Sequence, residues 1–450
     1  MPYAIFGLVI LLMAGYMVLR WLAPRSRRRP VTPELPARAP DQEPVQEVDP
    51  ELVRQVRQFQ SAHRPSAPAA PITRSGGAAE AMMTVRVELG RQAYDVLIGP
   101  GLLEAVGPTA RACAAGQSAF IITDSNVGPL YADRAAGSLR AAGYTVHVAS
   151  FPADEPHKTL ATASSLFDDL FAAATPPDRS SVVVALGGGV VGDVAGFVAA
   201  TLLRGVPFIQ APTTLLADVD SSVGGKTGVD HAAGKNLIGA FHQPRAVCVD
   251  TRVLATLPAA ELAGGLAECV KHGIIRDASL IDWLEQHAGS LRPDSAEPLG
   301  ELIARNVAIK AAVVAADERE AGERAHLNFG HTIGHAIEAE RGFGGAGGDY
   351  LRHGHCVALG MVAANHIAVG RGRLTEQDAQ RIEALLGRLH LPVRLAGLDA
   401  DHLLAIMRHD KKSHAGRLRF ILPARRLGAV QVVDDVSEAE IRAAIEYIGS

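Results

Sequence analysis

Hydrophobic residues in the first half of the chain, from residue 83 onward, occur in short runs that predict β-strands. Residues 84–99 alternate between apolar and polar positions, which is typical of two paired strands. Continuous apolar runs, which predict buried strands, follow at residues 119–124, 145–151, 181–186 and 207–212. Because Ala-rich stretches with helical spacing separate these runs, we expect a mostly parallel sheet covered by helices on both faces.

The second half of the chain has a different pattern. Beyond about residue 258, apolar positions recur with helical spacing at residues 261–275, 299–317, 331–340 and 355–370. The predicted fold class is therefore α/β, with an α/β domain at residues 82–257 followed by a mostly α-helical domain at residues 258–450.

The first 81 residues differ from both halves. Residues 1–19 carry no charge and would span about 28 Å as a helix, close to the thickness of a bilayer. Five arginines follow within residues 20–29, which predicts a transmembrane anchor at residues 1–23 with the rest of the chain in the cytoplasm, tethered to the inner membrane. Residues 24–81, rich in Pro and Ala, read as a flexible linker that could contain a short helix at residues 49–59. The alternative is that translation starts at Met82 or Met83 and the protein is purely cytoplasmic.

Composition excludes some classes of protein. The net charge of −4 and the 5% of aromatic residues argue against a nucleic-acid binder. The four cysteines lie far apart without a C-x-x-C pair, which argues against a disulfide framework or a structural zinc knuckle.

A glycine-rich turn follows the strand predicted at residues 181–186. Gly187, Gly189 and Gly192 form a G-x-G-x-x-G pattern between that strand and a helix, which favours a dinucleotide pyrophosphate at the helix N-terminus. The acidic residue usual about 20 positions on is missing, and Pro207 stands there. Asp124, at the end of an earlier strand, is a candidate for the ribose hydroxyls. The alternative is a purely structural turn.

Histidines and a glutamate in the second half suggest a metal site. His331 and His335 are four residues apart and share one helix face, and Glu268 lies three residues before Lys271 on another helix. With His353, these residues could hold a divalent ion such as zinc and leave positions open for substrate hydroxyls. From spacing alone, the His331/His335 pair is favoured as ligands.

Cations in Gly-rich or apolar surroundings form a third feature. Many surface lysines and arginines are merely solvated, but this set could bind a small molecule carrying both a carboxylate and a phosphate. Its members are Arg204, Lys226, Lys235, Lys271, Lys310, Arg324, Lys411 and Lys412.

From about Met83 to its end, the chain resembles the 3-dehydroquinate synthase family. The resemblance rests on segments in family order at residues 155–160, 187–200, 202–229, 234–244, 265–275, 327–338 and 410–423. It implies a Rossmann-like NAD-binding α/β domain and a mostly α-helical metal-binding domain, with zinc or cobalt in the cleft between them. It also implies conversion of 3-deoxy-D-arabino-heptulosonate 7-phosphate to 3-dehydroquinate and phosphate, with NAD used catalytically.

The resemblance assigns residues to each role. It implies that Glu268, His331 and His353 are the metal ligands, and that His335 is a neighbouring substrate or proton-transfer residue. The implied NAD contacts are Asp124, Asn126, Glu155, Lys158, Gly188, Gly189, Val190, Val191, Gly192, Asp193, Thr213, Thr214, Lys226, Lys235 and Thr256. The implied substrate-anion pocket consists of Lys226, Asn236, Lys310, Arg324, Asn328 and Lys412, with Asp220, Lys271 and Glu320 near the reacting hydroxyls. Arg204 resembles an arginine donated to a neighbouring subunit, which implies a homodimer.

Three departures from the family and three rival functions remain. The first departure is the N-terminal anchor and tether, which the family normally lacks. The usual His-Gly-Glu reads His353-Gly354-His355 here, so His355 could compete as a ligand, and the glycine-rich stretch at residues 342–349 is longer than the family's loop. The rivals are a cyclase that makes deoxy-inosose or valiolone, a metal-dependent polyol or glycerol dehydrogenase, and an inactive membrane-tethered scaffold.

Overall fold

The structure, a computed structural model, describes residues 69–75, 82–320, 322–341, 350–410 and 418–450. The anchor predicted at residues 1–23 and the helix considered at residues 49–59 lie outside these ranges. No helix within the described ranges is long and apolar enough to cross a membrane. The described residues all belong to one compact unit.

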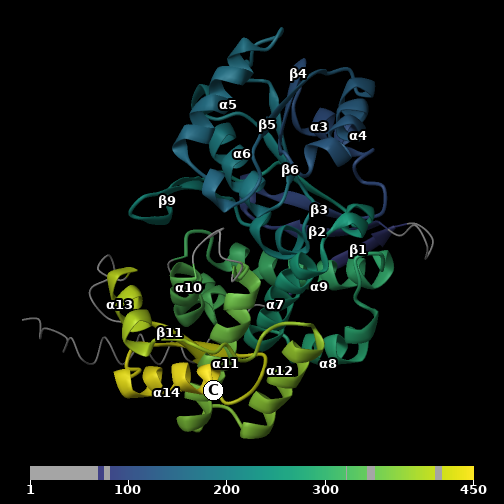
Figure 1. Ribbon diagram of the computed structural model, residues 1–450. Helices are drawn as coiled ribbons and strands as arrows, with labels where there is room; N and C mark the ends of the chain where they lie inside the picture. Colours follow the sequence, from purple (N-terminus) through teal and green to yellow (C-terminus); the bar gives the residue numbers. More distant parts are fainter. Residues whose placement is uncertain (1–68, 76–81, 321, 342–349, 411–417) are drawn as a thin grey trace, which may run out of the picture. The chain divides into compact units, whose positions relative to one another are not determined.

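A central sheet of eight strands organises the first part of this unit (Figure 1). The strand order is β1-β2-β3-β10-β7-β6-β4-β5. The two pairings among β1, β2 and β3 are antiparallel, and every other pairing is parallel. The strands are β1 (Ile72–Ser75), β2 (Met82–Val87), β3 (Tyr94–Gly99), β4 (Ser118–Asp124), β5 (Thr145–Phe151), β6 (Val182–Gly187), β7 (Phe208–Pro212) and β10 (Ala246–Asp250).

Helices cover both faces of the parallel part of the sheet, as the apolar runs predict (Figure 1). In β4, Ile121 packs in one core cluster with α3 (Val106–Cys113) and α4 (Gly128–Ala141). The next residue, Ile122, packs in another cluster with α5 (Leu160–Ala172) and α6 (Gly189–Thr201). Successive side chains of a strand point to opposite faces, so a strand that is apolar at every position needs a helical layer on each side.

The second part is mostly helical, as predicted. Its helices are α7 (Ala259–Ile275), α8 (Ala278–His287), α9 (Ala296–Ala316), α10 (His331–Glu340), α11 (His353–Gly370), α12 (Glu376–Arg388), α13 (Ala400–Asp410) and α14 (Glu438–Gly449). A short hairpin, β11 (Phe420–Pro423) with β12 (Val430–Val433), is the strand component in this part. The largest core cluster joins α7, α9 and α11 to β2 and β3, so it crosses the domain boundary predicted at residue 257.

The structure differs from the sequence predictions in two places. The linker assignment of residues 24–81 is wrong for Ile72–Ser75, which form β1 and pair with β2. A hairpin that the apolar pattern did not reveal, β8 (Lys226–His231) with β9 (Gly234–Phe241), follows a π-helical turn at Ala217–Ser221. Its second strand has no buried residue, so hydrophobic patterning carries no signal for it.

Candidate active site

The predicted glycine-rich turn lies between β6 and α6, as expected. Gly188 is the N-cap of α6, so the free backbone N–H groups of the first helical turn lie just beyond the carboxyl end of β6. A Cβ on Gly187 would lie 2.5 Å from Cγ2 of Val191, so the chain can turn this sharply only without a side chain there. The turn therefore fits the pyrophosphate of a dinucleotide.

Other predicted NAD residues gather at the same edge of the sheet. The carboxylate of Asp124, at the end of β4, accepts hydrogen bonds from the backbone N–H groups of Asn126 and Val127, both at 2.8 Å. Thr213 follows β7, and its backbone N–H donates to Gly187 O at 3.0 Å. Thr256 Oγ1 lies 2.6 Å from the hydroxyl of Tyr131. These hydrogen bonds fix the loops at the carboxyl edge of the sheet. The contact of Asp124 with a ribose stays a prediction.

Lys158 joins the nucleotide end of the sheet to the β8–β9 hairpin. Its ammonium group donates to Asp193 Oδ2 on α6 and to Asn236 Oδ1 on β9, each at 2.5 Å. The side chain is almost fully buried. Burial alone would lower the pKa of Lys158, but Asp193 and Glu155 raise it, so the ammonium stays charged. Asn236 has a φ of 55°, a strained backbone conformation that such a fixed contact can hold.

Lys235 extends these contacts toward the helical part. Its ammonium lies 2.8 Å from Glu155 Oε1 and 3.1 Å from Glu338 Oε1 on α10. Glu155 belongs to a 3-10 turn (Glu155–His157) beside Lys158, whereas Glu338 lies next to His353. One lysine therefore bridges the predicted nucleotide site and the predicted metal site.

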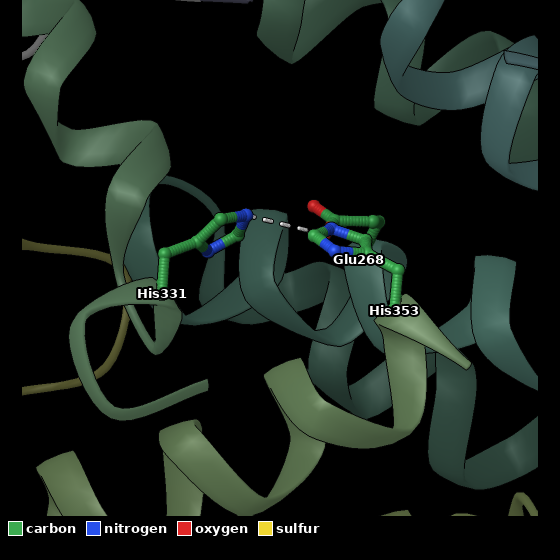
Figure 2. A group of neighbouring side chains, drawn as sticks. All are labelled: Glu268, His331 and His353. Carbon is green, nitrogen blue, oxygen red and sulfur yellow. Dashed lines mark ion pairs between the residues drawn. The ribbon is translucent and has the colours of Figure 1, made fainter. Parts of the chain in front are cut away.

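Glu268, His331 and His353 come together from three helices, α7, α10 and α11, and their side chains point toward one another (Figure 2). Oε1 of Glu268 lies 3.7 Å from Nε2 of His331 and 3.6 Å from Nε2 of His353. The three ligand atoms lie within 4.8 Å of one another. Both carboxylate oxygens of Glu268 are buried, and the ammonium of Lys271 pairs with Oε2 from the same helix. A carboxylate and two imidazoles with this convergence fit a zinc or cobalt ion.

Two of the three residues have the protonation state that a metal ligand needs. Burial, followed by the charge of Lys271, lowers the pKa of His331 to about 3, so its imidazole is neutral at neutral pH. Burial alone would raise the pKa of Glu268, but Lys271 lowers it below the ordinary value. Burial alone would lower the pKa of His353, but Glu268 and Glu338 raise it to about 9. A bound cation would thus displace a proton from His353.

A close crossing of α7 and α11 brings two of these ligands together. A Cβ on Gly354 would lie 2.2 Å from the carbonyl oxygen of Gly264, closer than any two such atoms can approach. Gly354 follows His353, and Gly264 is one helical turn before Glu268. Because neither position carries a side chain, the two backbones can touch, and the two ligands reach each other.

The two other candidate histidines, His335 and His355, differ in their distance from this group. The His335 ring centroid lies 5.0 Å from that of His331 and 5.9 Å from that of His353, so His335 stands beside the group. The pair favoured from spacing alone is thus close in space, but the compact set with Glu268 includes His353 instead. Among the described residues, His355 belongs to no group that could hold a metal, so the structure does not support its competition as a ligand.

Charged residues extend from the metal group toward the sheet. Lys271 forms a fully buried ion pair with Glu268 on the same helix. Asp220, in the π-helical turn, accepts a hydrogen bond from Lys310 Nζ at 2.6 Å and lies 3.9 Å from His272 Nε2. Burial alone would raise the pKa of Asp220, but Lys310 and Lys271 hold it well below its usual range. Burial lowers the pKa of Lys310 to about 8.

The other predicted anion-binding residues surround the same region. Lys226 forms an ion pair with Glu320, which also accepts a hydrogen bond from Asn328 Nδ2 at 2.8 Å. Glu320 has a φ of 60°, a second strained position within the predicted site. Arg324 is buried, and its guanidinium donates to Gly224 O at 3.0 Å and to Glu318 O.

One predicted residue, Arg204, makes none of these contacts, and two others lie outside the described residues. Arg204 is exposed, in a loop where its φ is 69°. Within the described part of the chain it makes no hydrogen bond or ion pair, and its role in a neighbouring subunit stays a prediction. Lys411 and Lys412 and the glycine-rich stretch at residues 342–349 lie outside the described residues.

Sequence reasoning missed three buried residues in this region. Glu338 contacts both His353 and Lys235, and His272 Nδ1 lies 3.0 Å from Asn306 Oδ1. Glu338 follows His335 by three residues, so helical spacing places it on the same face of α10. That spacing was the available signal for Glu338. No comparable local signal pairs His272 on α7 with Asn306 on α9.

The glycine-rich turn and the carboxylate–imidazole group are features of proteins that bind a dinucleotide and a metal, and comparisons with known sequences identify the family. Family models described as 3-dehydroquinate synthase N-terminal and C-terminal match residues 148–264 and 265–413. The 3-dehydroquinate synthase of Desulforamulus reducens is 48% identical over 365 residues, covering 81% of this chain and 99% of its own. That of Symbiobacterium thermophilum is also 48% identical over 365 residues, with 80% and 99% covered. The chain belongs to the 3-dehydroquinate synthase family.

Solved structures share the fold. A 2-epi-5-epi-valiolone synthase from Streptomyces hygroscopicus, with NAD⁺ and Zn²⁺ bound, is 31% identical with a TM-score of 0.71 and covers 79% of this chain and 96% of its own. A 2-deoxy-scyllo-inosose synthase complexed with carbaglucose-6-phosphate, NAD⁺ and Co²⁺ is 28% identical with a TM-score of 0.70, covering 80% and 99%. A glycerol dehydrogenase from Schizosaccharomyces pombe is 17% identical with a TM-score of 0.54, covering 78% and 87%, and shows the fold alone.

Proposed function

We propose that this protein is a 3-dehydroquinate synthase, which converts 3-deoxy-D-arabino-heptulosonate 7-phosphate to 3-dehydroquinate and phosphate in the shikimate pathway. The observation that carries the proposal is a continuous set of polar contacts. It runs from Glu155 through Lys235 and Glu338 to His353 and Glu268, and so connects the nucleotide end of the sheet to the metal group. An enzyme that oxidises and re-reduces one substrate carbon needs both groups in a single site.

Two bound groups supply chemistry that amino-acid side chains lack. The N-terminus of α6 would hold NAD, which would supply a hydride acceptor that also serves as the donor later in the turnover. Glu268, His331 and His353 would hold a divalent metal, which would supply a Lewis acid for the substrate hydroxyls at C4 and C5. The valiolone synthase structure contains Zn²⁺ and the inosose synthase structure contains Co²⁺, and we propose one such ion per chain.

The side chains of this protein bind the substrate and manage its protons. Lys226, Lys310 and Arg324 supply positive charge for the substrate's carboxylate and phosphate. Lys412, Asn236 and Asn328 would complete this pocket. Asp220, Lys271 and Glu320 would hold protons near the reacting hydroxyls, and His335 would contact the substrate or transfer a proton. The substrate's own phosphate oxygens would accept the C6 proton as phosphate leaves.

Two further features belong to the proposal. We propose a homodimer in which Arg204 reaches the neighbouring subunit's site, because this arginine is exposed and held in a strained turn. We also propose a cytoplasmic catalytic part. The anchor at residues 1–23 stays a prediction, and fractionation of cells that make the full-length chain tests it.

Phosphate release from the heptulosonate phosphate is the decisive assay. The purified full chain, with NAD⁺ in amounts far below the substrate and with Zn²⁺ or Co²⁺, should release one phosphate per substrate without net accumulation of NADH. Net NADH would indicate a polyol dehydrogenase instead. Turnover of glucose 6-phosphate or sedoheptulose 7-phosphate, without turnover of the heptulosonate, would indicate the inosose or valiolone alternative.

The metal ligands can be tested separately. His331→Ala removes one of two imidazoles from the group, so metal binding and turnover should both be lost. Metal content measured on the dialysed protein, together with phosphate release, checks this result. A variant that retains its metal and its activity would refute the ligand role of His331.

A further inference from the structure

Glu338 is a buried carboxylate that the predicted active site does not include. It lies on α10, and only 4% of its surface is exposed to solvent. Oε2 lies 3.3 Å from Nδ1 of His353, and Oε1 lies 3.1 Å from the ammonium of Lys235. A buried carboxylate is costly unless its charge is paired, and both oxygens of Glu338 are used.

The two imidazoles of the metal group make corresponding contacts through their ring nitrogens. Each presents Nε2 to Glu268, at 3.7 Å for His331 and 3.6 Å for His353. Nδ1 of His331 lies 3.0 Å from the backbone oxygen of Phe329, whereas Nδ1 of His353 faces Glu338. A histidine that binds a metal through one ring nitrogen usually donates the N–H of the other to a carbonyl or a carboxylate, which fixes its tautomer and ring orientation.

We propose that Glu338 is a positioning residue for the metal site, holding His353 so that its Nε2 faces Glu268 and His331. The inference rests on the proposed function, because it assumes that these three residues bind the ion. Lys235 secures Glu338 from the opposite side, so the orientation of His353 depends on a contact from the β8–β9 hairpin. A neutral acceptor would form a weaker hydrogen bond with the Nδ1–H group, leave less electron density on Nε2 and so make His353 a poorer ligand.

Glu338 could instead bind a cation itself, since its carboxylate, His335 and His353 also lie close enough to share one. Two observations favour positioning. The ammonium of Lys235 occupies Oε1 and is itself held 2.8 Å from Glu155, so a cation at Glu338 would face a fixed positive charge. A cation bound by His353 Nδ1 would also displace the proton that this nitrogen shares with Glu338 Oε2, 3.3 Å away.

The test compares three variants of the full-length protein by titration with Co²⁺. In Glu338→Gln the amide oxygen can still accept from Nδ1 but lacks the charge, and Co²⁺ affinity should fall about 10-fold to 100-fold. In Glu338→Ala the loss should be larger. Glu340→Gln is the matched control, because Glu340 lies on the same helix and makes no hydrogen bond or ion pair with a described residue. Its Co²⁺ affinity should stay within about two-fold of the wild type, since no ligand moves.

The absorption spectrum of bound Co²⁺ separates positioning from direct ligation. Because the ligands are unchanged, Glu338→Gln at saturating Co²⁺ should show the wild-type spectrum, and thermal unfolding should confirm that the variant is folded. A different spectrum at saturation would make Glu338 a direct ligand and overturn the inference, as would wild-type affinity in Glu338→Gln. If the wild-type protein binds no Co²⁺, the proposed metal site itself fails, which is a separate result.

Discussion

The nucleotide side and the metal side of this site are built in opposite ways. The turn that would hold the dinucleotide is a single segment, β6 followed at once by α6. The metal group takes Glu268, His331 and His353 from three helices that are far apart in the sequence. The first depends on local backbone geometry, whereas the second depends on how closely helices pack.

This difference predicts which changes each side tolerates. On the nucleotide side, a Cβ at Gly187 would clash with Val191, one helical turn further along the chain. On the metal side, a Cβ at Gly354 would clash with the backbone of another helix, at Gly264. The clash at Gly187 includes Cβ of Val191 at 2.6 Å, so it would shift the first turn of α6, which carries no metal ligand. The clash at Gly354 would separate two helices, each of which carries a metal ligand.

The largest effect is expected for Gly354→Ala. The new methyl group would meet the carbonyl of Gly264, so α7 and α11 must separate, which costs about 1–3 kcal/mol or more of the free energy of unfolding. Metal affinity should fall at least about tenfold, since Glu268 and His353 lie on the two separated helices. Thermal unfolding and Co²⁺ titration measure both effects.

Gly370→Ala is the matched control for this variant. Gly370 is the last residue of the same helix, and a Cβ there would meet nothing within 4 Å. Its stability and metal affinity should match the wild type. Equal behaviour of the two variants would show that the helix crossing does not set the metal geometry.

A smaller and more selective effect is expected for Gly187→Ala. The methyl group would press on Val191 and displace the first turn of α6, so NAD⁺ should bind about tenfold more weakly, a loss of about 1.4 kcal/mol. Co²⁺ affinity should be unchanged, because no metal ligand lies on α6. Gly137→Ala, on α4 with open space around its Cβ, is the control. Calorimetric titrations with NAD⁺ and with Co²⁺ measure the two affinities. An equal loss of NAD⁺ and Co²⁺ affinity would contradict the view that the two sides are built independently.

The smallest effect is a pH-dependent change in stability from Asp218→Asn. Asp218 lies in the π-helical turn between the two sides, fully buried, and neither carboxyl oxygen has a hydrogen-bond partner among the described residues. Burial raises its pKa well above the ordinary value, so the folded state holds a proton that the unfolded state loses above about pH 4. The free energy of unfolding therefore falls as the pH rises. Asparagine removes this dependence, and the variant should gain more in melting temperature at pH 8 than at pH 5.

Asp178→Asn should behave in the opposite way. Hydrogen bonds from Ser180 lower the pKa of Asp178, so its contribution to stability is present at neutral pH and is lost only in acid. The asparagine variant should melt slightly lower than the wild type at pH 8, with the difference shrinking toward pH 3. An Asp218→Asn variant that loses stability at pH 8 would show that the carboxylate is ionised and paired in the folded protein.

The sequence predicted what local patterns determine. Apolar runs located β4 to β7, and G-x-G-x-x-G located the turn at Gly187. Helical spacing placed His331 and His335 on one face, but only the resemblance to the family selected His353 over His335. Spacing within one helix cannot report which residue of another helix will arrive beside it. For the same reason, the pairing of Glu338 with His353 and that of His272 with Asn306 emerged only from the packed structure.

Anomalous X-ray diffraction from crystals grown with NAD⁺ and Co²⁺ tests the central claim most directly. We expect one strong peak at the cobalt edge, within bonding distance of Glu268, His331 Nε2 and His353 Nε2, with the nicotinamide ring facing it. A peak elsewhere, or a metal at these residues with the dinucleotide bound away from the α6 turn, would contradict the account.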